Sequence, residues 1–120
     1  MGFLDRIRKK GAPATPADAD QLVIRQLESR GADLTKPRHV IHYLYFPGEA
    51  DARRAANVIE QAGYDAAVGS PDDAIQEWSV RAEGHRVVGT STVEGFRAWF
   101  ERIAGEHRGE YDGWEAAAKP

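Results

Sequence analysis

The spacing of apolar residues along the chain alternates between a helical period and a strand-like period. Leu22, Val23 and Leu27 recur at helical spacing after a Thr-Pro pair typical of a helix start, so a helix is predicted over residues 16–30. An alanine-rich pattern predicts a second helix over residues 49–62. An aromatic pattern predicts a third over residues 92–106, and the stretch STVE at residues 91–94 has the form of a capping box at its start.

The strand-like segments lie between and after these helices. Residues 39–46, HVIHYLYF, predict the strongest strand because they are aromatic and β-branched and are followed by Pro-Gly. Weaker strands are predicted over residues 64–68 and 77–82, with residues 83–89 either extending the latter or turning away. Residues 110–116 follow a glycine and are short enough to form a fourth strand.

The strand at residues 39–46 is unusual because both of its alternating sets are largely apolar. Such a pattern indicates a strand that is covered on both faces, or one that carries a functional apolar patch on one face. The pattern alone therefore does not assign His42 to a face of the sheet. One set is Val40, His42, Leu44 and Phe46, and the other is Ile41, Tyr43 and Tyr45.

The element order α-β-α-β-β-α-β indicates an α+β fold. Without the first helix it is the split βαβ order of a ferredoxin-like two-layer sandwich, with a four-stranded antiparallel sheet and helices on one face. The other face would be open and available as a binding platform. Residues 1–15 are expected to form a basic flexible N-terminal arm and linker, and residues 16–117 a single domain.

The charge of the chain is divided unevenly between this arm and the predicted domain. The 120 residues carry a net charge of −3, but residues 1–10 contain four bases and one acid, which leaves −6 on the remainder. An acidic domain argues against nucleic acid as the main partner, because phosphate binding needs clustered Lys and Arg. A basic protein partner is electrostatically favoured. No apolar run has the length of a transmembrane segment, and no signal peptide is visible, so a cytoplasmic location is expected.

The sequence offers little catalytic chemistry. It has no cysteine, no GxSxG motif and no glycine-rich phosphate loop, and its four histidines do not form a metal-ligand spacing. Asp72 and Asp73 follow a proline, where acids usually form a turn. The expectation is a non-enzymatic protein that needs no cofactor and no metal.

The most distinctive short segment is GEYDGWEA, residues 109–116, which sets two aromatic residues among three acids. As a regular strand it would place Asp112 and Trp114 on one face and Tyr111 on the other. In the ferredoxin-like order, Asp112 and Trp114 could lie near His42, where a carboxylate would raise the pKa of the imidazole. Two interpretations stay open: a surface recognition pocket, or a structural strand whose Trp is hydrogen-bonded.

Three segments of the chain, taken together, resemble a known family. GADLTKPRHVIHYLYFP, AGYDA and EYDGWEA occur in this order and are similar to the family of the regulator of ribonuclease E activity B, RraB, over about residues 17–117. The resemblance implies a helix before a ferredoxin-like unit and a non-catalytic regulator of RNA decay in bacteria. Such regulators bind an Arg-rich scaffold region of the endoribonuclease. The resemblance also implies a partner-binding pocket that contains His42, Tyr111, Asp112, Gly113 and Trp114.

Two other functions remain open from the sequence. One is a small-molecule or peptide-binding module that uses a pocket on the open sheet face, formed by His42, Asp112 and Trp114. The other is a single-stranded RNA binder that stacks bases on Tyr43, Tyr45 and the tryptophans. Direct nucleic-acid binding is not expected, because the domain is acidic.

Overall fold

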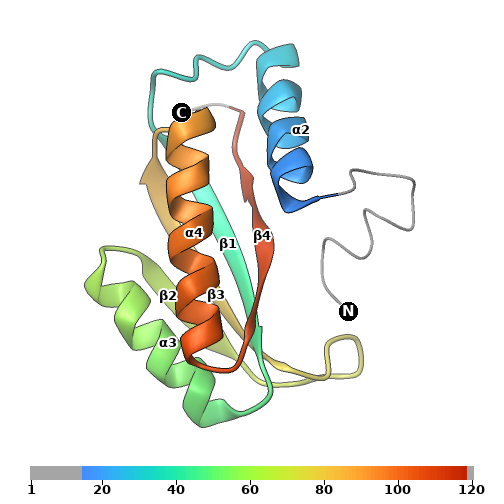
Figure 1. Ribbon diagram of the computed structural model, residues 1–120, viewed down its shortest axis with the longest axis vertical. Coiled ribbons are helices and arrows are strands. Elements are labelled where there is room, and N and C mark those ends of the chain that lie inside the picture. Colours follow the sequence, from blue (N-terminus) through green and yellow to red (C-terminus); the bar gives the residue numbers. More distant parts are fainter. Residues whose placement is uncertain (1–14, 119–120) are drawn as a thin grey trace.

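The computed structural model describes residues 15–118, which form three helices and one four-stranded sheet (Figure 1). The predicted arm, residues 1–15, lies outside the described residues except for Thr15. The sheet has the order β2-β3-β1-β4, and every neighbouring pair is antiparallel. This order confirms the predicted α+β fold. The elements are α2 (Pro16–Ser29), β1 (Arg38–Phe46), α3 (Glu49–Gln61), β2 (Asp65–Gly69), β3 (Trp78–Arg86), α4 (Thr90–Glu106) and β4 (Glu110–Ala116).

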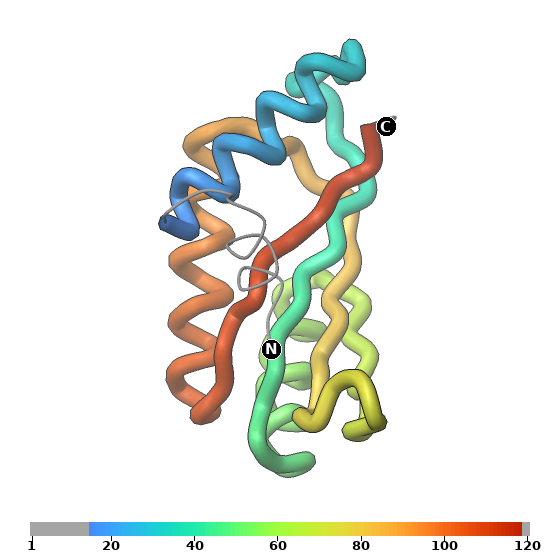
Figure 2. The backbone as a smooth tube through the Cα atoms, turned by 90° about the vertical axis from the view of Figure 1, so that its right-hand side faces the viewer, coloured from blue at the N-terminus to red at the C-terminus, as the bar shows by residue number. Residues whose placement is uncertain are grey.

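The helices lie on one side of the sheet. In Figure 1, α3 and α4 lie in front of the strands, and α2 lies beside the upper part of β4. Figure 2 shows that α2 runs from α4 across this end of β4. The ferredoxin-like unit therefore begins at β1, and α2 is an additional helix that closes one corner of the sandwich.

The structure assigns the two apolar sets of β1 to opposite faces. Val40, His42, Leu44 and Phe46 are all 0% exposed, and they face the helices. Their partners on β3 include Ala82 and Val80, which are also fully buried. The other set faces the opposite side of the sheet, which α2, α3 and α4 leave uncovered, and Tyr43 is half-buried there. His42 is thus a residue of the hydrophobic core.

Near α4, the structure decides between the two alternatives for residues 83–89, and it moves the predicted start of the helix. Strand β3 continues to Arg86, because residues 83–86 pair with the first residues of β1. Helix α4 begins at Thr90, before the predicted capping box, with Gly89 as its N-cap. The Gly89 N–H donates a hydrogen bond to the Thr92 hydroxyl at 2.8 Å, so the backbone N–H of the N-cap residue has a partner. None of the helices within residues 15–118 is long and apolar enough to cross a membrane.

Candidate partner-binding site

Strand β4 carries four of the five residues predicted for the pocket, and it pairs with β1 around a β-bulge. Trp114 lies opposite His42, but Tyr111 lies opposite Leu44, so Asp112 is an extra residue in the register. Gly113 has φ 128°, a conformation that residues with a Cβ rarely adopt. The bulge places Tyr111 and Trp114 on the same side, facing the helices. The predicted regular alternation, with Tyr111 opposite in orientation to Trp114, is therefore wrong.

The five residues predicted for the pocket lie together, but they lie in the interior. His42 is 0% exposed, Asp112 1%, Trp114 2% and Tyr111 5%, and Gly113 is also buried. The helices α2 and α4 cover this side of β4 (Figure 2). Very little of these side chains is therefore exposed on the surface of the folded protein. Their geometry corresponds to the structural interpretation, in which the strand contributes a hydrogen-bonded Trp.

His42 is surrounded by aromatic rings. Its ring stacks on Phe100 with centroids 4.1 Å apart, and its Nδ1 lies 2.9 Å from the Tyr111 hydroxyl. Burial, followed by the positive charges of Arg86 and Arg97, lowers the pKa of His42 from 6.5 to about 3. The expected increase of this pKa by a nearby carboxylate is therefore wrong. His42 is a neutral core residue at physiological pH.

The buried His42 makes stability depend on pH. At pH 5 the unfolded histidine, with a pKa of about 6.5, binds a proton that the native residue does not, so stability is lost as pH falls from about 6.5 towards 3. Between pH 7 and pH 5 this residue should cost about 2 kcal/mol of unfolding free energy. Urea denaturation at both pH values should show that His42→Phe loses about 2 kcal/mol less unfolding free energy between pH 7 and pH 5 than the wild type does. An equal loss in the two proteins would contradict the burial of a neutral imidazole.

A buried ion pair joins the additional helix to the rest of the domain. Arg97 on α4 donates to both carboxylate oxygens of Asp20 on α2, and one of the two bonds is 2.8 Å long. The Trp114 indole N–H donates to the same carboxylate at 2.8 Å. The Arg97 guanidinium also lies 5.0 Å from the centre of the Tyr111 ring. We call Asp20, Arg97 and Trp114 the Asp20 cluster; it connects α2, α4 and β4.

Sequence reasoning missed Asp20 and Arg97, although the helical period contained a signal. Asp20 lies in line with Ile24 and Leu27, which are buried on α2. Arg97 lies between Val93 and Phe100, at positions that are buried on α4. A charged residue within an apolar helical stripe is buried only when it is paired. An acid within the apolar stripe of one helix and a base within that of another therefore predict a buried ion pair between the two helices.

A groove lies between α2 and the end of β4, and Trp114 contributes to its lining. Its volume is about 250 Å³, and it is bordered by Val23, Gln26, Leu27, Arg30, Trp114, Glu115 and Ala116. Trp114 is the only residue of the predicted pocket in this lining. The hydrogen bond to Asp20 fixes the orientation of the Trp114 indole, so this side of the groove is rigid.

The open face of the sheet carries polar, aromatic and charged side chains. Tyr43 donates a hydrogen bond to the Glu115 carboxylate at 2.6 Å, which connects β1 with β4. Burial, followed by this hydrogen bond, raises the pKa of Tyr43 to about 12, so the hydroxyl keeps its proton. Glu83 on β3 lies 2.8 Å from His39 Nε2 and 3.3 Å from Arg81. These contacts hold the side chains of the open face in a fixed arrangement.

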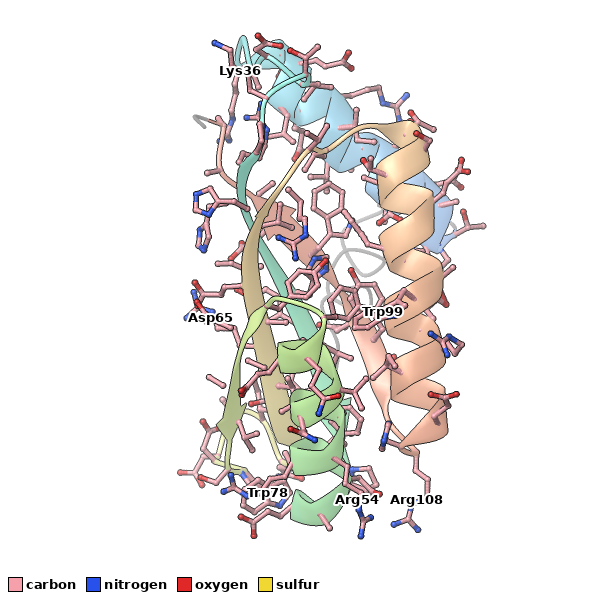
Figure 3. The ribbon with its side chains drawn as sticks, turned by 90° about the vertical axis from the view of Figure 1, so that its left-hand side faces the viewer. Lys36, Arg54, Asp65, Trp78, Trp99 and Arg108 are labelled. Atoms are coloured by element: carbon pink, nitrogen blue, oxygen red, sulfur yellow. The ribbon has the colours of Figure 1, made fainter. Side chains whose placement is uncertain are left out.

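The central part of this face has a negative net charge. Asp65 on β2 is the register partner of Glu83 and points away from the helices (Figure 3). Glu115 lies on β4 at the other side of the same row, opposite Ile41. Three carboxylates therefore share this row, and the guanidinium of Arg81 lies two residues along β3, in the row of Tyr43. The face can attract cations, and Tyr43 offers them an aromatic ring.

Comparison with known proteins identifies the family of the chain. No curated protein matches the sequence. A family model described as regulator of ribonuclease activity B, RraB, matches residues 17–116, from the second residue of α2 to the end of β4. This match covers most of the chain and confirms the resemblance seen in the sequence. The chain therefore belongs to the RraB family of regulators of ribonuclease activity.

Proposed function

We propose that this protein regulates RNA decay by binding an Arg-rich scaffold segment of ribonuclease E through the open face of its sheet. The observation that carries the proposal is the row of Asp65, Glu83 and Glu115 on the face that none of the three described helices covers. The family supplies the class of target, a ribonuclease. The chemistry of the open face supplies the class of segment, a basic one.

Arginine matches this face better than lysine does. A guanidinium is planar, so it can form two hydrogen bonds with a carboxylate and stack on an aromatic ring. Glu115 and Tyr43 lie in direct contact and present both partners side by side. Glu83 is only half-exposed and is already oriented by His39 and Arg81. Little side-chain entropy is then lost when an arginine binds.

The buried residues of β4 support this surface indirectly. Trp114 and Tyr111 fix the strand to the core, and Glu115 follows Trp114 directly. The bulge at Gly113 is what allows both aromatic side chains to face the helices. We therefore infer that the segment EYDGWEA positions Glu115 on the open face, and that its aromatic residues act through this positioning.

The other two functions have less support. The groove beside Trp114 has about 250 Å³, which is below the roughly 300–1,000 Å³ of typical small-molecule pockets. RNA binding would place phosphates against the carboxylates of the open face, which repel them. A protein partner with a basic segment has neither disadvantage.

Binding measurements with matched variants test the proposal. Calorimetry of the full chain with the ribonuclease E scaffold segment should show binding that weakens at least tenfold in Tyr43→Ala/Glu115→Ala, because the variant lacks one stacking surface and one carboxylate. Arg53→Ala/Glu49→Ala removes an exposed contact pair on α3, away from the open face, and should bind like the wild type. Equal affinities of the wild type and the Tyr43/Glu115 variant would place the contact elsewhere.

A further inference from the structure

The first turn of α2 is flanked by two hollows that share Arg97 and Glu101. The α2–α4 hollow has a volume of about 190 Å³ and is bordered by Ala17, Glu94, Ala98 and Glu101, among others. The α4–β4 hollow has a volume of about 300 Å³ and includes Pro16, Ala104, Glu110 and Tyr111 in its border. Each hollow therefore borders a residue, Pro16 or Ala17, close to the start of the described part of the chain.

The two hollows are acidic at their rims. Asp20, Glu94, Glu101 and Glu110 border them, against the single guanidinium of Arg97, which gives a net charge of −3. The Arg97 guanidinium already donates two hydrogen bonds to the Asp20 carboxylate and lies 3.5 Å from the Glu101 carboxylate. Glu94, Glu101 and Glu110 are exposed. Their charges are available to a cationic segment that enters the hollows.

The preceding residues of the same chain have the complementary composition. Residues 1–14, MGFLDRIRKKGAPA, contain Arg6, Arg8, Lys9 and Lys10 against Asp5, a net charge of +3. They also contain three large apolar side chains, those of Phe3, Leu4 and Ile7, and the borders of the hollows include Ala and Pro side chains of matching apolar character. The sequence thus combines the charge and the apolar groups that the two hollows can accept.

We propose that residues 1–14 dock into these two hollows as an intramolecular basic ligand. Lys10 is six residues from Pro16, a span of at most about 20 Å, so its ammonium group can reach both hollows. The covalent connection gives the segment a local concentration in the millimolar range, so that weak ion pairs suffice for occupancy. Docking would leave the open sheet face free, and the proposal therefore does not rest on the proposed function.

Paramagnetic labelling tests this contact in the full chain. The sequence has no cysteine, so Gly2→Cys provides a single site for a nitroxide. Docking predicts strong broadening of the amide signals of Glu94, Ala98 and Glu101. In Glu94→Lys/Glu101→Lys, which reverses two exposed charges, the broadening should fall by at least half, and about 0.5 M salt should have the same effect on the wild type.

Two matched controls separate docking from general attraction. Asp73→Lys/Glu77→Lys reverses two acids in the loop between β2 and β3, outside both hollows, and should leave the broadening unchanged. Arg8→Glu/Lys9→Glu reverses the segment itself without touching the described fold and should abolish the broadening. The proposal is wrong if broadening persists in the Glu94/Glu101 variant, or if the loop variant loses it to the same extent.

Discussion

Replacing Asp20 with alanine should lower the free energy of unfolding by about 3–5 kcal/mol, measured by urea denaturation at pH 7. The substitution leaves the Arg97 guanidinium, in a residue only 9% exposed, without the carboxylate that it contacts through two bonds. It also removes the acceptor of the Trp114 indole N–H. Glu101, 3.5 Å from Arg97 and half-exposed, compensates only in part. The loss arises from an unpaired buried charge.

Two further variants make this expectation specific. Glu49→Ala removes an exposed ion pair with Arg53 four residues along α3, and should cost less than about 1 kcal/mol. Asp20→Leu/Arg97→Met replaces the buried pair with apolar groups and should recover a large part of the stability lost in Asp20→Ala. A loss below about 1 kcal/mol in Asp20→Ala would mean that α2 is not fixed by this ion pair.

Trp114→Ala should be about as destabilising, with a loss of roughly 3–5 kcal/mol. The indole is 2% exposed and meets the Phe96 ring edge-on with centroids 5.2 Å apart. Its removal leaves a cavity between α2, α4 and β4 and an unused hydrogen-bond site on Asp20. The urea concentration at the midpoint of unfolding should therefore be much lower for Trp114→Ala than for the wild type, in the absence of any binding partner.

Trp114→Phe is the matched control for the indole. Phenylalanine retains most of the apolar contact with Phe96 but cannot donate a hydrogen bond to Asp20. The loss in Trp114→Phe should be clearly smaller, about 1–2 kcal/mol. If Trp114→Ala left the denaturant midpoint unchanged, the burial of β4 would be wrong and the segment would be a surface element.

The sequence was sufficient to predict the fold because the spacing of apolar residues distinguished helices from strands. Gly, Pro and capping residues marked many of their ends. The aromatic strand at residues 39–46 and the alanine-rich helix that begins at residue 49 are in the positions that their patterns predict. The face of His42 was not predictable, since both sets of that strand are apolar. The structure decides it through the cross-strand partners Val80 and Ala82, which lie under α3 and α4.

The candidate site was harder to predict, for a local and a long-range reason. One extra residue at Asp112 reverses the alternation of β4, and a regular period of two cannot represent it. The pairing of Asp20 with Arg97 joins residues 77 positions apart, so a local pattern can indicate each buried charge but does not identify its partner. The open-face residues Glu83 and Glu115 were missed because single exposed acids look like ordinary solvated charges in a sequence.

The most direct test of the central claim is cleavage of RNA by ribonuclease E in the presence of this protein. The substrate should be one whose cleavage depends on the scaffold region of the nuclease. The wild type and the Arg53→Ala/Glu49→Ala control should alter the cleavage rate at the same concentration, whereas Tyr43→Ala/Glu115→Ala should require at least ten times more protein. An equal effect of all three proteins, or no effect of the wild type, would contradict regulation through the open sheet face.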